Sequence, residues 1–167
     1  MTGEKLDQLL QQNLSPQDAS NKFLTFFAQS KLYGISISNV NGITQIQQIT
    51  DMPELPHYIK GVINLRGVVI PLVDVNLRLG STQQPYTDRT CIITLEVNEN
   101  HVGCIVDAVD AVIDIPEEAI SPPPPLTDSM AGYITGIGKC GEEGKKIVLL
   151  LDCRALVGEI SLAQARA

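Results

Sequence analysis

The sequence predicts an all-β fold with a few short helices, arranged as two small barrels packed together. Short apolar runs bounded by Gly, Pro, Asn or Asp recur along the chain, a pattern typical of barrels and sandwiches. Three sequence blocks occur twice in the same order, which indicates an internal duplication. A chain of 167 residues, 44% of them hydrophobic, is long enough to bury the core of such a pair.

The expected strands are short, and the first two form a hairpin around Gln29 and Ser30. Strands are expected at residues 23–28, 31–37, 62–64, 68–73, 91–97, 102–106 and 147–152. Single helical turns or short helices are expected at residues 5–14, 53–58, 76–79 and 154–158. Helical segments are therefore minor and lie mostly between or after strands.

The duplication defines the expected domain organisation. Residues 33–40 match 102–109, residues 58–62 match 133–137, and residues 69–74 match 147–152. The offset grows from 69 (Gly34 to Gly103) to 75 (Gly61 to Gly136) and 78 (Asp74 to Asp152), so the second copy carries small insertions. We expect a first barrel at about 21–82 and a second at about 83–160, with tails at 1–20 and 161–167. Strand exchange between the barrels stays open.

The charge of the chain excludes several classes of partner. Twelve basic residues against 19 acidic ones give a net charge of -7, without any basic run. Binding to nucleic acid or to an anionic membrane surface requires clustered basic residues, so neither is expected. No apolar stretch approaches the ~18 residues of a membrane span, and the first ten residues lack a signal core. We therefore expect a cytoplasmic protein without direct membrane insertion.

The sequence contains no recognisable catalytic constellation. Its two histidines, His57 and His101, do not neighbour a candidate nucleophile, and no nucleophile elbow, zinc helix motif or phosphate loop is present. The cysteines lack the close spacing that zinc or redox sites need, and they are expected to be free, mostly buried thiols: Cys91, Cys104, Cys140 and Cys153. We expect no enzyme activity, cofactor or metal. A small-molecule or metal-binding barrel using the cysteines is an alternative of another class.

Several polar or unusual segments have a structural interpretation. Asp74 and Asp152 end the same strand in the two copies and are expected to cap the turn that follows. The prolines at 122–125 predict a stiff spacer. The acidic residues of the following group are expected on a solvated face: Asp107, Asp110, Asp114, Glu117 and Glu118.

Arg66 is the charged residue with the clearest functional potential. It lies between two apolar runs and precedes Gly67, which permits a tight turn. An arginine projected from a rigid turn can pair in a bidentate manner with a carboxylate of a partner. An internal salt bridge or a solvated loop charge explains the same pattern equally well.

The segment from Tyr58 to Asp74, YIKGVINLRGVVIPLVD, resembles the CheW family of chemotaxis coupling proteins. Residues 34–40, 102–109 and 133–138 extend this resemblance, which covers about 21–157. It implies two intertwined five-stranded SH3-like β-barrels that share a hydrophobic interface. It also implies a non-catalytic adaptor that couples the cytoplasmic tips of methyl-accepting chemoreceptors to the regulatory domain of a CheA-type histidine kinase, within membrane-associated receptor arrays. A coupling protein of a pilus-type or other chemosensory-like pathway is the alternative.

The resemblance further implies which residues contact partners. Val40 matches a position associated with receptor coupling, and Val109 and Val112 match positions lining the groove between the barrels where a receptor tip docks. Gly61 and Arg66 match positions that support receptor and kinase contacts. The remaining candidates are neighbours of these positions: Ile43, Asn64, Leu65 and Gly67.

One departure from the family pattern concerns Arg66. Relatives often carry Val-x-Glu-Ile where this chain has Val40-Asn41-Gly42-Ile43. The missing glutamate would be a natural partner for the arginine. We therefore expect Arg66 to pair with Asp51, Glu54 or the binding partner itself.

Overall fold

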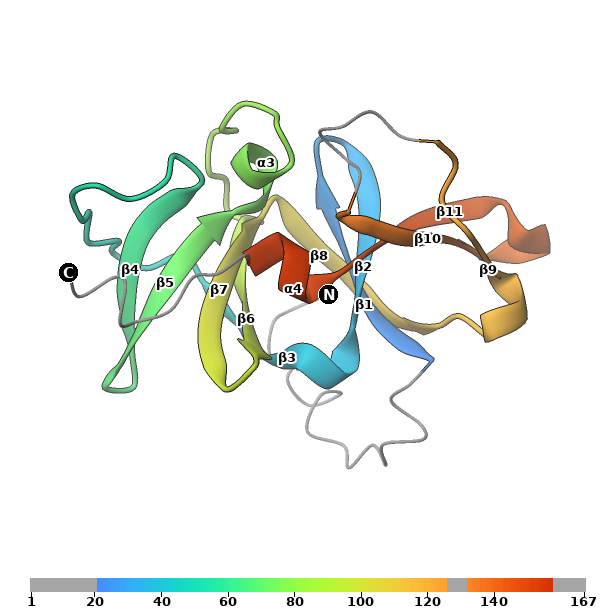
Figure 1. Cartoon of the computed structure of the whole chain (residues 1–167), viewed down its shortest axis with the longest axis horizontal. Helices are drawn as coiled ribbons and strands as arrows, with labels where there is room; N and C mark the ends of the chain where they lie inside the picture. Colours follow the sequence, from blue (N-terminus) through green and yellow to red (C-terminus); the bar gives the residue numbers. More distant parts are fainter. Residues whose placement is uncertain (1–20, 126–131, 158–167) are drawn as a thin grey trace.

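The computed structural model describes residues 21–125 and 132–157, which form two curved β-sheets side by side (Figure 1). The expected helix at 5–14 lies outside these residues. Sheet A has the order β8 (Ala108–Asp114), β1 (Lys22–Ala28), β2 (Lys31–Ser36), β11 (Lys146–Leu151), β10 (Ile134–Cys140) and β9 (Ile120–Ser121). Sheet B has the order β3 (Val40–Gln45), β6 (Cys91–Val97), β7 (Asn100–Val106), β5 (Val68–Asp74) and β4 (Ile59–Leu65). The predicted all-β class is confirmed.

The two copies of the repeat exchange their first hairpins. The β1–β2 hairpin of the first copy pairs with β8 and β11 of the second, and the β6–β7 hairpin of the second pairs with β3 and β5 of the first. The pairing is equivalent on both sides, since Leu150 lies opposite Gly34 and Leu72 lies opposite Gly103. Each SH3-like barrel therefore contains strands from both copies, and the sheets do not divide near residues 82 and 83.

The short helices and the unpredicted strands follow from local sequence. The expected helices at 76–79 and 154–158 are present as α3 (Val75–Arg78) and α4 (Cys153–Val157), with short 3-10 turns at Ile37–Asn39, Glu117–Ala119 and Glu142–Gly144. The expected helical turn at 53–58 is wrong, because this proline-containing segment forms only turns. Strands β3, β8, β9 and β10 were not expected, since polar residues and glycines interrupt their apolar pattern.

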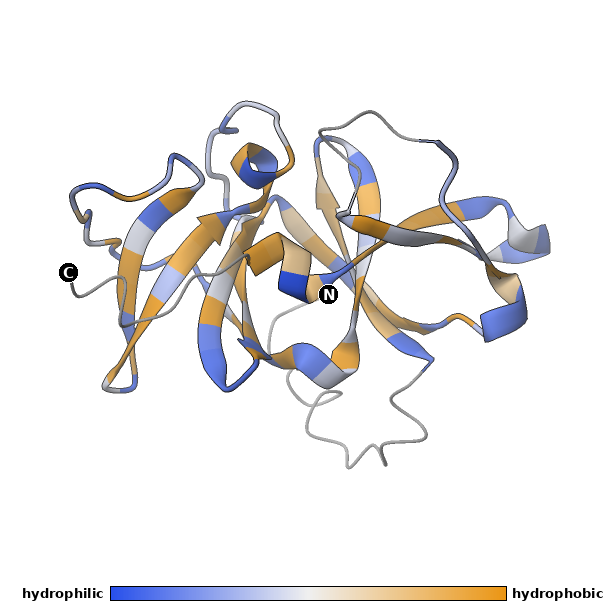
Figure 2. Cartoon of the chain, viewed as in Figure 1, coloured by the Kyte–Doolittle hydropathy of each residue, from blue (hydrophilic) through white to orange (hydrophobic). Residues whose placement is uncertain are grey.

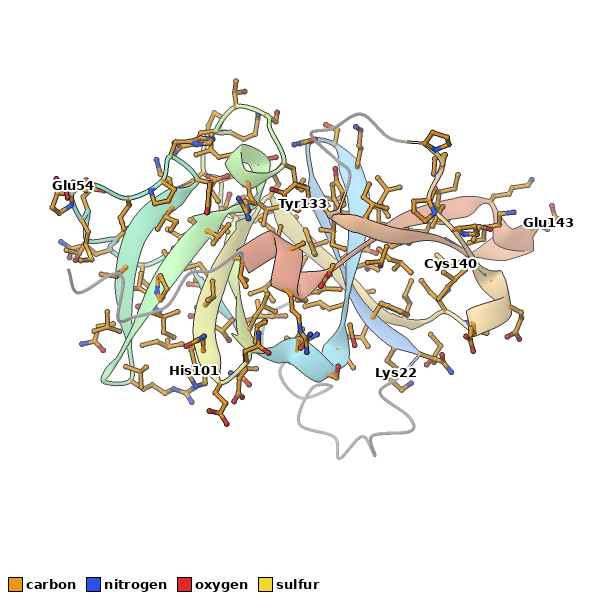
Figure 3. The ribbon with its side chains drawn as sticks, in the orientation of Figure 1. Lys22, Glu54, His101, Tyr133, Cys140 and Glu143 are labelled. Atoms are coloured by element: carbon orange, nitrogen blue, oxygen red, sulfur yellow. The ribbon has the colours of Figure 1, made fainter. Side chains whose placement is uncertain are left out.

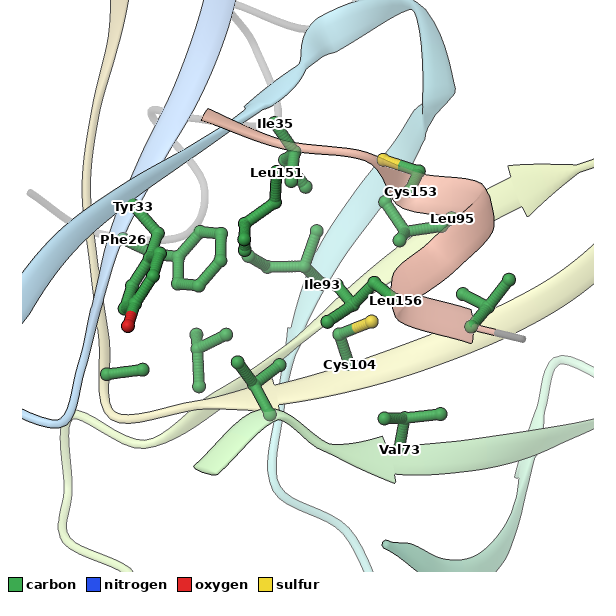
Figure 4. Close-up of a cluster of buried hydrophobic side chains, with 14 of the residues drawn as sticks. Phe26, Tyr33, Ile35, Val73, Ile93, Leu95, Cys104, Leu151, Cys153 and Leu156 are labelled. Atoms are coloured by element: carbon green, nitrogen blue, oxygen red, sulfur yellow. The ribbon is translucent and has the colours of Figure 1, made fainter. Parts of the chain in front are cut away.

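A shared hydrophobic core joins the two sheets. It includes Phe26 and Tyr33 of sheet A, Leu95 and Cys104 of sheet B, and Leu156 of α4, all at most 1% exposed (Figure 4). Smaller clusters fill each barrel, one around Leu72 and one around Leu150. In the ribbon coloured by hydropathy (Figure 2), hydrophobic residues lie mostly along the strands and hydrophilic residues mostly at the turns.

The two aspartates that end β5 and follow β11 cap the next helix, as predicted. The Asp74 carboxylate accepts a hydrogen bond from the Leu77 amide at 3.2 Å, and the Asp152 carboxylate accepts one from the Arg154 amide at 2.9 Å. Their own amides donate to the carbonyl oxygens of Tyr58 and Tyr133, both at 2.8 Å. The copies are thus equivalent down to individual backbone bonds.

Candidate functional site: an apolar hairpin tip

The β4–β5 hairpin ends in a two-residue turn formed by Arg66 and Gly67. Leu65 pairs with Val68, and the φ angles of Arg66 (53°) and Gly67 (86°) are both in the left-handed region. These values indicate a type I′ turn, the two-residue connection that best matches strand twist. The Asn64 side-chain oxygen accepts a hydrogen bond from the Gly67 amide at 2.8 Å. The predicted tight turn is therefore present and held by its own side chain.

Apolar side chains are exposed directly beside this turn. Val68 and Val69 are each 46% exposed. Successive strand residues point to opposite faces, so both faces of the hairpin tip present a valine to solvent. Elsewhere in the described part of the chain, the only large hydrophobic residues of comparable exposure are Tyr86 and Ile147. We call the segment Asn64–Val69 the hairpin tip.

The Arg66 side chain has no acidic partner among the described residues. The three ion pairs of this part of the chain join Lys22 to Asp114, Lys145 to Glu143, and Lys146 to Asp110. The internal pairing of Arg66 with Asp51 or Glu54 that the sequence allowed is thus not formed. The hairpin tip combines exposed apolar surface with a cation that is available to a partner.

Gly61 is buried in β4, where the preceding loop packs against the strand. Thr50 and Val62 form two backbone hydrogen bonds of 2.9 Å, which hold the preceding loop against β4. The φ angle of Gly61 is +141°, and a Cβ at this position would collide with the Thr50 carbonyl oxygen. Gly61 therefore lets the loop approach the strand, and it contributes no exposed surface of its own.

The four candidate valine and isoleucine residues form two equivalent pairs. Val40 and Ile43 lie on β3, and Val109 and Val112 lie at the equivalent positions of β8. All four are half-buried and pack against the shared core. A register shift follows Val40 in the β3–β6 pairing and adjoins Val109 in the β1–β8 pairing, so the equivalence includes the bulges.

The structure does not bring all nine candidates into one patch. The residues from Asn64 to Gly67 are contiguous in the hairpin tip. The β3 pair lies at the opposite end of the strand order of the same sheet, and the β8 pair belongs to the other sheet. The candidates therefore lie on three structural elements: the hairpin formed by β4 and β5, strand β3, and strand β8.

Two exposed residues of the hairpin tip, Val68 and Val69, are not predicted as partner-binding residues from the sequence. Val68 and Val69 belong to an apolar run that predicts a buried strand, and only its later members are buried. The available signal was the position of the two valines next to an Arg-Gly turn, since the end of a hairpin projects beyond the sheet.

The remaining chemically active groups are sequestered or separate. Cys104 and Cys153 are buried, while Cys91 and Cys140 are half-buried. Burial raises the pKa of the Cys153 thiol to about 12 and that of Cys91 to about 11, so both are neutral thiols at neutral pH. Residues 21–125 and 132–157 contain no cluster of three or more His, Cys, Asp or Glu side chains that could hold a metal ion.

The two histidines lie far apart in the sequence, and each has a different neighbour. His57 is exposed and stacks edge-on against Tyr58 at 5.7 Å, whereas the Nδ1 atom of His101 lies 3.1 Å from the Asn41 side-chain nitrogen. No helix in this part of the chain is long and apolar enough to cross a membrane.

Comparisons with known proteins agree with this arrangement. The chain is 32% identical to the chemotaxis protein CheW of Klebsiella aerogenes over 151 residues, 90% of this chain and 89% of that protein. It is 40% identical to CheW of Bacillus subtilis over 103 residues, 62% of this chain and 66% of that protein. It is 26% identical to protein FrzA of Myxococcus xanthus over 129 residues, 77% of this chain and 81% of that protein.

A solved structure has the same fold. The scaffolding protein TtCheW from Thermoanaerobacter tengcongensis superimposes with a TM-score of 0.76 and 35% sequence identity, covering 84% of this chain and 93% of that one. The profile described as the CheW-like domain matches residues 22–161, which include both sheets and the hairpin tip. The chain therefore belongs to the CheW family.

Proposed function

We propose that this protein is a non-catalytic adaptor of chemosensory signalling that acts through protein–protein contacts. The observation that carries the proposal is the hairpin tip, where two valines, each 46% exposed, flank a tight turn bearing an arginine without an internal acidic partner in the described residues. Protein interfaces typically combine an apolar centre with arginine and a polar rim. The hairpin tip has this composition.

The rigidity of the tip suits it to binding. The type I′ turn and the hydrogen bond between the Gly67 amide and Asn64 fix the backbone before any partner arrives. A preformed contact surface loses less conformational entropy on association than a flexible loop does. Val68 and Val69 can therefore bury apolar area on a partner while Arg66 pairs with a carboxylate of that partner.

The proposed partners are the regulatory domain of a CheA-type histidine kinase and the cytoplasmic tip of a methyl-accepting chemoreceptor. The family membership and the relatives named as chemotaxis proteins support this choice. We assign the kinase domain to the hairpin tip. The receptor tip, a helical hairpin, is assigned to the half-buried pairs Val40 with Ile43 and Val109 with Val112.

The proposed location and mode of action follow from these contacts. An adaptor of this kind works in the cytoplasm and is recruited to membrane-associated receptor arrays by its partners. Signals pass as small changes in how the interfaces pack, because the adaptor supplies no chemistry of its own. A coupling protein of a pilus-type or other chemosensory-like pathway is the second candidate.

The test is a calorimetric titration of the protein with the kinase regulatory domain from the same cell. We expect saturable binding near 1 μM, about −8 kcal/mol. Arg66→Ala should weaken binding about tenfold or more, because the partner carboxylate loses its cation. Arg89→Ala is the matched control, since Arg89 is also exposed and no side-chain contact of it is described.

The controls make the outcomes distinct. Each variant is checked for an unchanged unfolding temperature, because Arg66 makes no internal ion pair in the described residues and its loss should leave the fold intact. Binding that is equal for wild type and Arg66→Ala would remove the hairpin tip from the interface. No binding by the folded wild-type protein to any kinase or receptor tip of that cell would contradict the adaptor function.

A further inference from the structure

Arg78, the last residue of α3, connects the two sheets. Its Nε atom donates a hydrogen bond to the Leu156 carbonyl oxygen at 2.9 Å, and its Nη2 atom donates to the Ala155 carbonyl oxygen at 3.0 Å. Helix α3 follows β5 of sheet B, whereas Leu156 and Ala155 lie in α4, which follows β11 of sheet A. Both hydrogen bonds are donated by the guanidinium of one copy to backbone carbonyl groups of the other.

The same guanidinium lies between two tyrosines, one from each copy of the repeat. Its central carbon is 4.1 Å from the centroid of the Tyr58 ring and 5.3 Å from that of Tyr133. Tyr58 precedes β4 and Tyr133 precedes β10, at equivalent positions of the two copies. Figure 3 places Tyr133 near the middle of the molecule. A planar guanidinium can donate hydrogen bonds in its plane while its faces contact aromatic rings.

Arg78 thus lies at the point where the two copies meet. Applying the offset of 78 residues that relates Asp74 to Asp152, the equivalent of Arg78 is Leu156, whose carbonyl Arg78 binds. One copy supplies a buried leucine at this position and the other supplies the arginine. The contact is therefore asymmetric: one copy supplies the guanidinium and the other supplies the carbonyl groups that accept from it.

We propose that Arg78 is a positioning residue that sets the angle between the two sheets. The shared core resists separation of the sheets, but apolar contacts have no preferred direction and allow packed elements to slide. Arg78 adds two directional hydrogen bonds and two ring contacts that are satisfied together at one mutual orientation.

The consequence for function rests on the proposed function. The hairpin tip and the β3 part of the receptor site belong to sheet B, whereas the β8 part of the receptor site, Val109 and Val112, belongs to sheet A. The angle between the sheets then decides how the two parts of the receptor site face each other and how a bound receptor tip lies relative to a kinase domain on the hairpin tip. Arg78 fixes this geometry without touching either partner.

The test measures the distance between spin labels on the two sheets by pulsed electron resonance. Labels go on Glu96→Cys in β6 and Lys139→Cys in β10, two exposed strand positions. Cys91 and Cys140 are replaced by serine, while the buried Cys104 and Cys153 stay in place. Variants carry Arg78→Met, which keeps an apolar stem, or Arg78→Lys, which keeps the charge and loses the fork of donors. Arg154→Met on α4 is the matched control, because Arg154 is exposed.

We expect a narrow distance distribution in the unchanged chain and in Arg154→Met. In Arg78→Met the distance distribution should broaden, or its maximum should shift by more than the width seen in the unchanged chain. The distribution of Arg78→Lys should be intermediate between those of the unchanged chain and Arg78→Met. Superimposable distributions for folded Arg78→Met and the unchanged chain would overturn the proposal. If Arg78→Met does not fold, Arg78→Lys decides in the same way. The measurement involves no partner, so its failure is distinct from failure of the adaptor function, which the kinase titration reports.

Discussion

The β4–β5 and β10–β11 hairpins occupy equivalent places in the two copies, yet their tips have opposite character. Both contain the same register shift, between Ile59 and Gly61 in one and between Ile134 and Gly136 in the other. The first hairpin closes with the two-residue Arg-Gly turn and exposed valines. The second closes with residues 141–145, which include two glutamates and a lysine.

Two lysines at the second tip pair with carboxylates of the chain. Lys146, which takes the place of Val68, pairs with Asp110 at 3.2 Å, and Lys145 pairs with Glu143 at 3.3 Å. Ile147, which takes the place of Val69, is 57% exposed and stands alone among polar neighbours. The bases of the two hairpins are thus constrained by the core. The tips diverge: the first exposes two adjacent valines beside an arginine without an acidic partner in the described residues, whereas the second exposes one isoleucine beside Lys146, which pairs with Asp110.

The largest expected effect tests whether the buried ends of the β4–β5 and β10–β11 hairpins are equivalent. Leu72→Ala and Leu150→Ala remove side chains that lie over Gly103 and Gly34, and both leucines are at most 4% exposed. Each variant should lose about 2–5 kcal/mol of unfolding free energy through the cavity that it leaves. Denaturant unfolding measures the loss. A negligible effect in one copy beside a large one in the other would show that the cores are not equivalent.

The next largest effect compares the stability of the two copies at their register shifts, where each copy has a glycine. Gly61→Ala should destabilise the protein by about 2–4 kcal/mol, because a Cβ meets the Thr50 carbonyl oxygen and the backbone is left-handed. Gly136→Ala should cost about 1–2 kcal/mol, since its Cβ meets chiefly the Ile120 side chain at 2.9 Å, which can move. Thermal unfolding of the two variants gives the ranking. The reverse ranking would mean that the loop bridging to β4 is unimportant for stability.

A third prediction addresses the difference between the tips directly. Val68→Ser with Val69→Ser should weaken binding of the kinase regulatory domain by about 1–3 kcal/mol, roughly 5–150-fold, because apolar contact area is lost. Ile147→Ser on the other hairpin should leave this affinity unchanged. Calorimetric titrations measure both. Equal losses would show that the second tip shares the same interface despite its internal ion pairs.

The smallest effect concerns pH. Burial raises the pKa of Asp74 above its usual value, against the opposing influence of its hydrogen bonds to the backbone. The folded state therefore holds this proton more tightly than the unfolded state does, so stability falls as pH rises from the ordinary aspartate range through the raised pKa and is constant above it. Asp74→Asn keeps a side chain that can cap the helix, and it should remove this pH-dependent part of the unfolding free energy. Unfolding free energies measured from pH 3 upward test it, with Asp152→Asn as the control for loss of a capping carboxylate.

Local sequence was sufficient to predict much of the fold. Continuous apolar runs such as residues 91–97 predicted strands, and the repeated blocks predicted the duplication. The glycine-rich strand β10 was not predicted, because glycine carries no hydrophobic signal. Gly136 and Gly138 are nevertheless needed there for close packing. The hairpin exchange could not be predicted either. Gly34 and Gly103 are equivalent, and nothing in the local sequence says which copy's leucine lies over each.

The candidate site was predictable in part for related reasons. The Arg66-Gly67 turn was visible because a tight turn has a local signature. The exposure of Val68 and Val69 depends on how far the hairpin extends beyond its neighbours, which is a property of the whole sheet. Arg78 resembles any basic residue at the end of a helix until its partners, 77 and 78 residues away in sequence, are known.

The exchange of hairpins has a consequence for how the chain is made. The β1–β2 hairpin leaves the ribosome early, but its sheet is incomplete until β8 and β11 follow, the latter ending at Leu151. At a synthesis rate of about 5–20 residues per second, the hairpin waits on the order of ten seconds with both edges unpaired. In the exchanged pairing, neither half of the gene therefore encodes a unit that can complete its own sheet during translation. A free half-chain could complete a sheet with the equivalent hairpin of its own copy or, by exchange, with that of a second chain.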